Sequence, residues 1–278
     1  MTGGSEGIGL AAAHIAVDRG ARVSLVARRP DVLEAAAAEV GGGTRWASAD
    51  VSDAAALDAA IAQLTEAQGP VDVLLTSAGY ARPARALDTP VEEFRRQMEV
   101  NYLGTVHAIG AVVPSMVERR RGHLVLVSST AGLVGVYGYS AYAPTKFAVR
   151  GLGESLRSEL RPHGVRVSVV YPPDTDTPGF AEENRTKPLE TAAISGSIAP
   201  RPAEHVALAV VRGIERDRLT IVADPITAVL ARGAGLLAPA VRSHADRVIE
   251  RVQSTQRHGG ARAEGDPRPP DGARWRRR

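Results

Sequence analysis

Tyr142 and Lys146 are the two residues of this sequence whose chemistry and spacing together could move a proton. They lie four residues apart in a segment that reads as helix, so both side chains share one helical face. A phenol titrates near pH ~10 in water, and a cation beside it favours the phenolate and lowers its pKa. Tyr137 and Tyr139 have alanine four residues later and lack this partner. The spacing therefore predicts an acid–base device centred on Tyr142.

A glycine-rich segment opens the chain and runs into a helical pattern from Leu10 to Arg19. Its glycines at 3, 7 and 9 suit a tight turn that brings backbone to a pyrophosphate at a helix N-terminus. The next segment, Arg22 to Ala27, reads as a strand. Such a loop should follow a buried apolar strand, and none stands before Thr2, so we expect the N-terminal strand to be missing.

Three further segments are suited to bind other parts of a dinucleotide that carries this pyrophosphate. Arg28 and Arg29 stand where a carboxylate would bind the ribose of NAD, and a guanidinium there suits the 2′-phosphate of NADP. Asp50 and Val51 end the next strand and are placed to face an adenine ring. The small-residue turn 77–79 lets backbone approach a ligand.

Strands and helices alternate along the rest of the chain, which predicts an α/β fold: a Rossmann-like doubly wound parallel sheet with helices on both faces. Helices are expected at 31–40, 53–68, 90–119, 142–161 and 202–216, and strands at 44–48, 71–76, 123–127, 165–171 and 219–223. Asn101, with Gly104 three residues later, breaks local helix rules in a way that often marks a site. The polar segment from 172 to Pro200 is expected to be a long loop, either a lid or disordered.

Composition narrows the function classes. The 278 residues include no cysteine, and the seven histidines show no HExxH spacing, so we expect no metal site. The net charge of +3 is concentrated in residues 257–278, an Arg-, Pro- and Gly-rich tail expected to be disordered. We expect a dinucleotide-binding, Rossmann-like domain over 1–224 and a helical extension over 225–256. The apolar stretch from Ile226 to Val241 is interrupted by Arg232, which favours a core or interfacial helix over a membrane span.

The motifs together resemble the short-chain dehydrogenase/reductase family over roughly residues 2–224. The matching positions are Thr2-Gly-x-x-x-Gly7-x-Gly9, Ser77-Ala78-Gly79, Asn101, Ser129, Tyr142-x-x-x-Lys146 and a proline-rich turn ending in Thr177. Pro173 departs from the family pattern, which commonly has glycine there. The resemblance implies a Rossmann-like fold and reduction of a ketone by NADPH.

The resemblance also implies roles for individual residues. Tyr142 would protonate the carbonyl oxygen, Lys146 would hold the nicotinamide ribose and depress the Tyr142 pKa, Ser129 would bind the oxyanion, and Asn101 would position a relay water. The expected NADPH/NADP-binding residues are Gly3, Ser5, Glu6, Gly7, Ile8, Gly9, Arg28, Asp50, Val51, Ser77, Ala78, Gly79, Tyr142, Lys146, Pro172, Thr175 and Thr177.

Within that family, residues 171–191 look like the corresponding loop of 3-ketodihydrosphingosine reductases, which reduce a long-chain amino ketone in sphingolipid synthesis. This resemblance implies a small-molecule lipid ketone as substrate. Acidic residues of the loop, such as Asp174, Asp176, Glu182 or Glu183, would either pair with the substrate ammonium or form a solvated lid surface. Family analogy favours a homo-oligomer, and we expect no nucleic-acid partner.

Other interpretations stay open. The enzyme would act on another lipid or xenobiotic ketone, or the chain would be an inactive truncated member of the family. A distant alternative takes residues 3–7 as the GxSxG nucleophile elbow of a serine hydrolase that uses Ser5. We expect a cytoplasmic protein with peripheral contact at a membrane surface.

Overall fold

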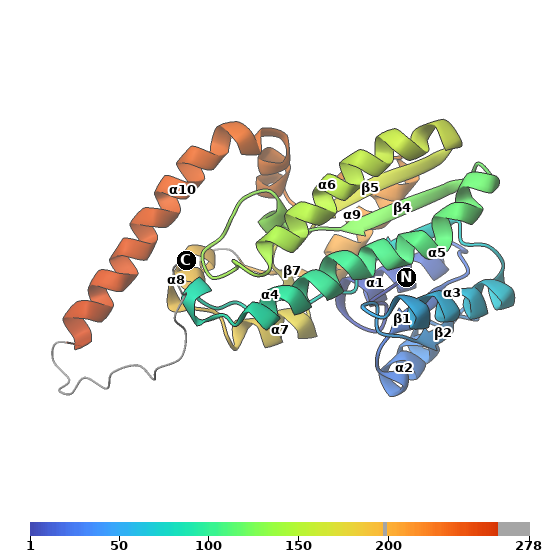
Figure 1. Cartoon of the computed structure of the whole chain (residues 1–278), viewed down its shortest axis with the longest axis horizontal. Helices are drawn as coiled ribbons and strands as arrows, with labels where there is room; N and C mark the ends of the chain where they lie inside the picture. Colours follow the sequence, from blue (N-terminus) through green and yellow to red (C-terminus); the bar gives the residue numbers. More distant parts are fainter. Residues whose placement is uncertain (197–198, 261–278) are drawn as a thin grey trace, which may run out of the picture.

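The computed structural model describes residues 1–196 and 199–260, which form a parallel sheet covered by helices on both faces (Figure 1). The strands are β1 (Ser24–Ala27), β2 (Arg45–Ser48), β3 (Val73–Thr76), β4 (Gly122–Val127), β5 (Val165–Tyr171), β6 (Thr175–Asp176), β7 (Arg201–Pro202) and β8 (Thr220–Val222). The α-helices are α1 (Gly7–Asp18), α2 (Pro30–Val40), α3 (Ala54–Gln68), α4 (Val91–Met98), α5 (Gly104–Glu118), α6 (Ala143–Leu160), α7 (Pro178–Asn184), α8 (Leu189–Ser195), α9 (Ala203–Glu215) and α10 (Pro225–Gly260). Short turns of helix are η1 (Ala86–Asp88), η2 (Glu99–Leu103), η3 (Thr130–Gly132) and η4 (Arg161–His163).

The main sheet consists of two parallel parts, β1–β2 and β3–β4–β5–β8. Thr2 lies between them, with parallel bridges to Val26 of β1 and Thr76 of β3. Its amide donates to Leu75 O at 3.0 Å, and its carbonyl accepts from Ser77 N at 3.1 Å. The α/β fold class is therefore confirmed. The missing first strand stays a prediction.

Apolar side chains fill both faces of this sheet. On one face, Leu57 of α3, Val112 of α5 and Val149 of α6 belong to a single buried cluster with β3, β4 and β5. On the other face, α1 and α9 pack with their alanines and valines against the alternate residues of the same strands. Burial on both sides explains why β4 is apolar almost throughout, as expected for a central parallel strand.

The expected helix 90–119 is one continuous run that contains a π-helical turn, η2, between α4 and α5. The run Val91–Glu118 is long and apolar enough to cross a membrane by length and composition. However, Ala108, Ile109 and Met116 of α5 are buried in the core, so the run packs as a core helix of the sheet. The π turn lies at Asn101, the position at which the sequence broke helix rules.

The segment expected as one long loop up to Pro200 contains two short helices, α7 and α8. Thr177 accepts a hydrogen bond from Phe180 N at 3.1 Å, and Pro178 takes the first helical position, so α7 has a capped start. Each of these helices has only seven residues, which is too short to show a repeating apolar pattern in the sequence.

α10 contains the helical extension expected at 225–256, with a non-helical residue at Gly233 where two helices meet in a kink. It continues through Gly260, so the first residues of the expected tail are helical, and 261–278 lie outside the described residues. α10 packs against α8, where the buried Glu190 carboxylate accepts hydrogen bonds from Arg85 (2.9 Å) and Gln253 (3.4 Å).

Candidate active site

A cavity of about 550 Å³ opens at the carboxyl ends of the parallel strands. Its wall includes Ser77 after β3, Ser129 after β4 and Pro172 after β5. Open α/β sheets bind ligands at this edge, because loops from successive strands converge there. The cavity also runs past α7 to residues of α10, so its lining combines sheet-edge loops with the additional helices.

Tyr142 and Lys146 both line this cavity, at the start of α6. The Lys146 ammonium lies 5.6 Å from the centre of the Tyr142 ring, and it donates to the Val127 carbonyl at 3.1 Å. Ser129 hydrogen-bonds Tyr142, and its hydroxyl also accepts from Ala131 N at 3.1 Å, which fixes its position. A phenol and an ammonium from the start of α6 and a hydroxyl from the end of β4 thus lie on one wall of the cavity.

The electrostatics of Tyr142 differ from the sequence expectation. Burial raises the pKa of Tyr142, the negative charge of Glu183 raises it further, and only the Ser129 hydrogen bond opposes this shift. Burial also lowers the pKa of Lys146 to about 8. The lowered Tyr142 pKa expected from the i,i+4 cation is therefore wrong for this structure, because burial and the negative charge of Glu183 shift this pKa upward. Tyr142 remains a protonated phenol at neutral pH, the form that donates a proton.

Asn101 holds the loop that follows β3. Its amide nitrogen donates to Tyr80 O at 2.9 Å and to Thr145 Oγ1 at 3.2 Å, and its amide oxygen accepts from Tyr80 N at 2.9 Å. A Cβ on Gly79 would come within 2.9 Å of the Asn101 oxygen and 3.5 Å of the Lys146 ammonium, so only glycine permits this approach. Asn101 thereby connects the ligand-facing turn to α6. The relay water that the resemblance implies stays a prediction.

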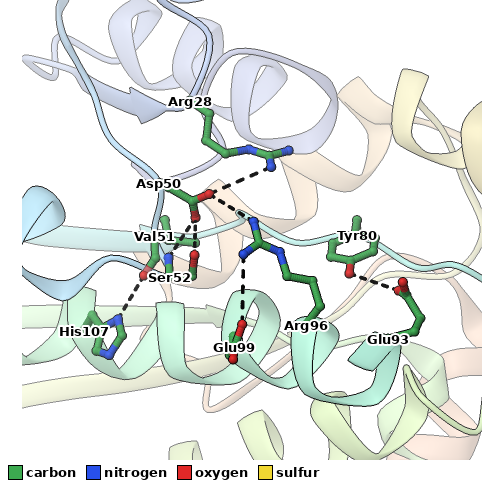
Figure 2. Close-up of polar contacts among 9 residues, drawn as sticks. All are labelled: Arg28, Asp50, Val51, Ser52, Tyr80, Glu93, Arg96, Glu99 and His107. Atoms are coloured by element: carbon green, nitrogen blue, oxygen red, sulfur yellow. Dashed lines mark hydrogen bonds and ion pairs between the residues drawn. The ribbon is translucent and has the colours of Figure 1, made fainter. Parts of the chain in front are cut away.

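The same helical run fixes the segment after β2. A Cβ on Gly104 would lie 2.6 Å from the Val51 side chain, and His107 Nδ1 contacts Val51 O at 2.9 Å. Figure 2 shows Asp50 beside Arg28, with Ser52 and Arg96 also on its carboxylate. Partial burial raises the Asp50 pKa, but the hydrogen bonds from Ser52 and the two guanidiniums lower it below its usual value. Asp50 is thus an oriented carboxylate at the cavity wall.

Tyr80 is held at its side chain as well as its backbone. Its hydroxyl donates to Glu93 at 3.0 Å, as Figure 2 shows. Burial, followed by the hydrogen bond to Glu93, raises the pKa of Tyr80 to about 12. The phenol therefore stays neutral and continues to donate, which keeps Tyr80 in place beneath Asn101.

The first residues of the chain fit a dinucleotide. α1 begins without a side-chain cap, so its first amides can bind a phosphate, and Ser5, Gly7 and Ile8 line the cavity there. Gly3 has φ of +65°, and a Cβ on it would lie 2.5 Å from Ala78 N, so this turn requires glycine. Glu6 pairs with Arg29 at 2.6 Å. The donors and the space suit the pyrophosphate of a nicotinamide dinucleotide, with Arg28 farther along the same wall.

Nearly all of the expected site residues line this one cavity. Two do not: Asn101 acts from behind it, and Gly9 lies under the loop, where a Cβ would come within 2.3 Å of Gly3 O. Sequence reasoning missed the α10 residues Ile226, Thr227, Leu230, Val241 and Ala245, which also line the cavity. The apolar pattern of this stretch, interrupted by Arg232, was the one sign in the sequence that the helix faces a cavity. That pattern did not predict the kink at Gly233, on either side of which these residues reach the site.

The hydrolase interpretation of Ser5 finds no support in the cavity. Among its described lining residues there is no histidine that could serve as the general base of a Ser nucleophile. The described residues also contain no group of three or more His, Asp or Glu side chains that could hold a metal ion. The chemistry available here is therefore that of the Tyr142 phenol and its neighbours.

Comparison with known proteins identifies a dehydrogenase family and several reductases as relatives of this chain. The family model described as short chain dehydrogenase matches residues 1–188. The 3-dehydrosphinganine reductase of Danio rerio is 44% identical over 231 residues, which cover 79% of this chain and 69% of that protein. The 3-ketodihydrosphingosine reductase of Bos taurus is 45% identical over 220 residues, covering 76% of this chain and 66% of that protein. The chain thus spans about two thirds of the length of these relatives.

A solved structure resembles the fold as a whole. The closed form of a serine dehydrogenase complexed with NADP⁺ has a TM-score of 0.74 and 27% sequence identity, covering 82% of this chain and 94% of that one.

Proposed function

Because the chain belongs to the short-chain dehydrogenase family, we propose that it reduces 3-ketodihydrosphingosine to dihydrosphingosine with NADPH. The chain is an oxidoreductase acting on the CH–OH/C=O pair. The observation that carries the proposal is the partly buried Tyr142 phenol, whose pKa is raised, on the wall of a cavity that the glycine-rich loop also lines. Similarity to reductases of a long-chain amino ketone supports the choice of substrate.

Each of three cavity residues has its own role in the proposed ketone reduction. NADPH bound at the glycine-rich loop would supply the hydride. Tyr142 gives its phenolic proton to the carbonyl oxygen, and Ser129 donates a hydrogen bond to that oxygen as negative charge develops on it. Lys146 would bind the nicotinamide ribose, and its cation favours the phenolate that remains after proton transfer.

The direct test is NADPH oxidation, followed by absorbance, with 3-ketodihydrosphingosine in detergent. We expect NADPH consumption that requires the ketone and yields the corresponding alcohol. Reduction of a different ketone, with none of this one, would retain the enzyme class and reject the substrate.

Arg28→Ala should weaken NADPH binding by about 10- to 100-fold and leave NADH binding nearly unchanged, since it removes a charged hydrogen bond to the 2′-phosphate. Arg28 is 65% exposed on its side chain and lies 4.0 Å from Asp50, so the substitution leaves no buried partner behind. Dissociation constants for both cofactors, measured by fluorescence titration, check this expectation. Arg45→Ala, which removes an exposed arginine of β2 outside the cavity, is the matched control. Equal losses for NADPH and NADH would show that Arg28 does not bind the 2′-phosphate.

For localisation, we propose a cytoplasmic protein that contacts a membrane surface through α10. Ile226, Val229 and Leu236 of this helix are exposed, Leu236 to 90%, and Arg232 lies among them. Apolar side chains beside cations favour an anionic lipid interface. Sedimentation with phosphatidylserine vesicles, compared with phosphatidylcholine vesicles, tests this contact, and equal failure to bind both would exclude it.

For assembly, we propose a homo-oligomer formed through η2 and α6. Leu103 of η2 and Phe147 of α6 are exposed to 39% and 41%, on helices that contact each other. Exposed apolar side chains on adjacent helices favour a protein interface. Light scattering after gel filtration measures the mass, and a monomer at micromolar concentration would contradict the proposal.

A further inference from the structure

Two acidic residues of the segment after β5 line the cavity. Asp174 and Glu183 line it together with Tyr142. Asp176 is exposed, and Glu182 is 68% exposed and pairs with Arg185 at 2.8 Å. The structure therefore separates a cavity pair from a surface pair, which the sequence alone could not do.

Two side chains, those of Tyr139 and Lys187, bind the Glu183 carboxylate. The Tyr139 hydroxyl donates to Glu183 Oε1, and the Lys187 ammonium lies 3.4 Å from the same oxygen. The Glu183 and Lys187 side chains are 15% and 6% exposed, and the Lys187 ammonium also lies 4.5 Å from the Phe180 ring centre. Within residues 1–196 and 199–260, no hydrogen bond or ion pair involves Glu183 Oε2. One oxygen is anchored, and the other is available to a ligand.

The charges around this carboxylate do not balance. Asp174 and Glu183 bring two negative charges, and Lys187 brings one positive charge. Burial raises the pKa of both carboxyls, which reflects the cost of holding two anions in an enclosed space. Both carboxylates also act on the Tyr142 hydroxyl, since their charges raise its pKa. A single ligand cation close to the reacting oxygen would neutralise the excess charge.

We propose that Glu183, assisted by Asp174, binds a substrate ammonium on the carbon next to the reacting ketone and makes the enzyme selective for amino ketones. The inference rests on the proposed function, because it assigns the recognition of that same substrate. The anchored carboxylate fixes the nitrogen, and the fixed nitrogen in turn orients the neighbouring carbonyl toward Tyr142. Tyr139 and Lys187 are positioning residues that hold the carboxylate in place.

The test compares Glu183→Gln with the wild-type chain on two ketones at saturating NADPH: 3-ketodihydrosphingosine and the matched ketone without the amine. We expect kcat/KM for the amino ketone to fall about 10- to 100-fold, mostly through KM, because a charged hydrogen bond is lost. For the amine-free ketone kcat/KM should stay within about threefold. Equal losses on both ketones, or no loss on either, would overturn the inference.

Glu182→Gln is the matched control: the same change, one residue earlier on α7, on a side chain whose ion-pair partner among the described residues is the surface residue Arg185. It should leave kcat/KM for both ketones unchanged. Asp174→Asn is the second variant, for use if Glu183→Gln does not fold. It should lower kcat/KM for the amino ketone selectively as well, and a uniform loss in Asp174→Asn would count against the inference.

A readout without turnover separates this inference from the proposed function. Calorimetric titration of the NADPH-loaded protein with dodecylamine and with dodecanol measures the preference for an ammonium directly. The wild type should bind the amine at least about 10-fold more tightly, and Glu183→Gln should lose that preference. If 3-ketodihydrosphingosine is not reduced, the proposed substrate fails, while this titration still decides whether Glu183 binds an ammonium. Equal binding of amine and alcohol by the wild type would reject the site.

Discussion

Replacing Tyr142 by Phe is expected to lower kcat for ketone reduction by about 10³-fold while leaving the dissociation constant for NADPH within about twofold. The change removes a hydroxyl and keeps the ring, so the packing against Tyr139, whose ring centre lies 5.7 Å away, is retained. The proposed function makes Tyr142 the proton donor, and its raised pKa keeps the phenol protonated at neutral pH. Steady-state kinetics and a fluorescence titration of NADPH measure the two effects separately.

The control for this substitution is Tyr102→Phe. Tyr102 lies in η2 outside the cavity, so the same loss of a hydroxyl should leave kcat unchanged. A Tyr142→Phe enzyme that keeps more than about a tenth of the wild-type kcat would require another proton donor and would reject the role assigned to Tyr142.

Replacing Gly9 by Ala is expected to weaken NADPH binding by about 10- to 100-fold and to destabilise the fold by about 1–3 kcal/mol. The added Cβ would lie 2.3 Å from Gly3 O and 3.0 Å from Gly3 C, and both are backbone atoms. The clash must therefore move α1 away from the glycine-rich turn, and the amides that would bind the cofactor phosphates move with it. Thermal unfolding and NADPH titration of the same variant measure both effects.

Gly110→Ala is the matched control, because Gly110 also lies within an α-helix but a Cβ there meets nothing within 4 Å. Alanine is the better helix former by about 1 kcal/mol, so this variant should be as stable as the wild type or more stable. If Gly9→Ala and Gly110→Ala behaved alike, the close approach of α1 to Gly3 would not be what fixes the cofactor loop.

The sequence predicted those parts of the site that depend on spacing along one element. Tyr142 and Lys146 reach one cavity because four residues make about one helical turn. The fold class followed from alternating apolar strands and helices, since strands buried on both faces are apolar throughout. The Asn101–Gly104 irregularity coincides with the π turn η2 and the start of α5, where Asn101 binds Tyr80 and Gly104 contacts Val51.

Other properties arise only from the tertiary arrangement. The pKa of Tyr142 shifts upward, opposite to the direction predicted, because burial depends on residues distant in sequence. The position of Gly9 behind the loop was equally hidden, since motif spacing does not distinguish a ligand contact from a packing contact. Glu183 and Lys187 were four residues apart and could have been found by spacing, but only coordinates show that the pair is buried.

The kink in α10 has a consequence for how this scaffold can diversify. Gly233 divides the helix so that Leu230 before it and Val241 after it both reach the cavity wall. Neither residue belongs to the sheet that positions Tyr142, so this part of the cavity wall can change without altering the Tyr142 wall. Exchange of small and large apolar residues on α10 would therefore change which chain lengths of the proposed lipid substrate fit, while the arrangement around Tyr142 is retained.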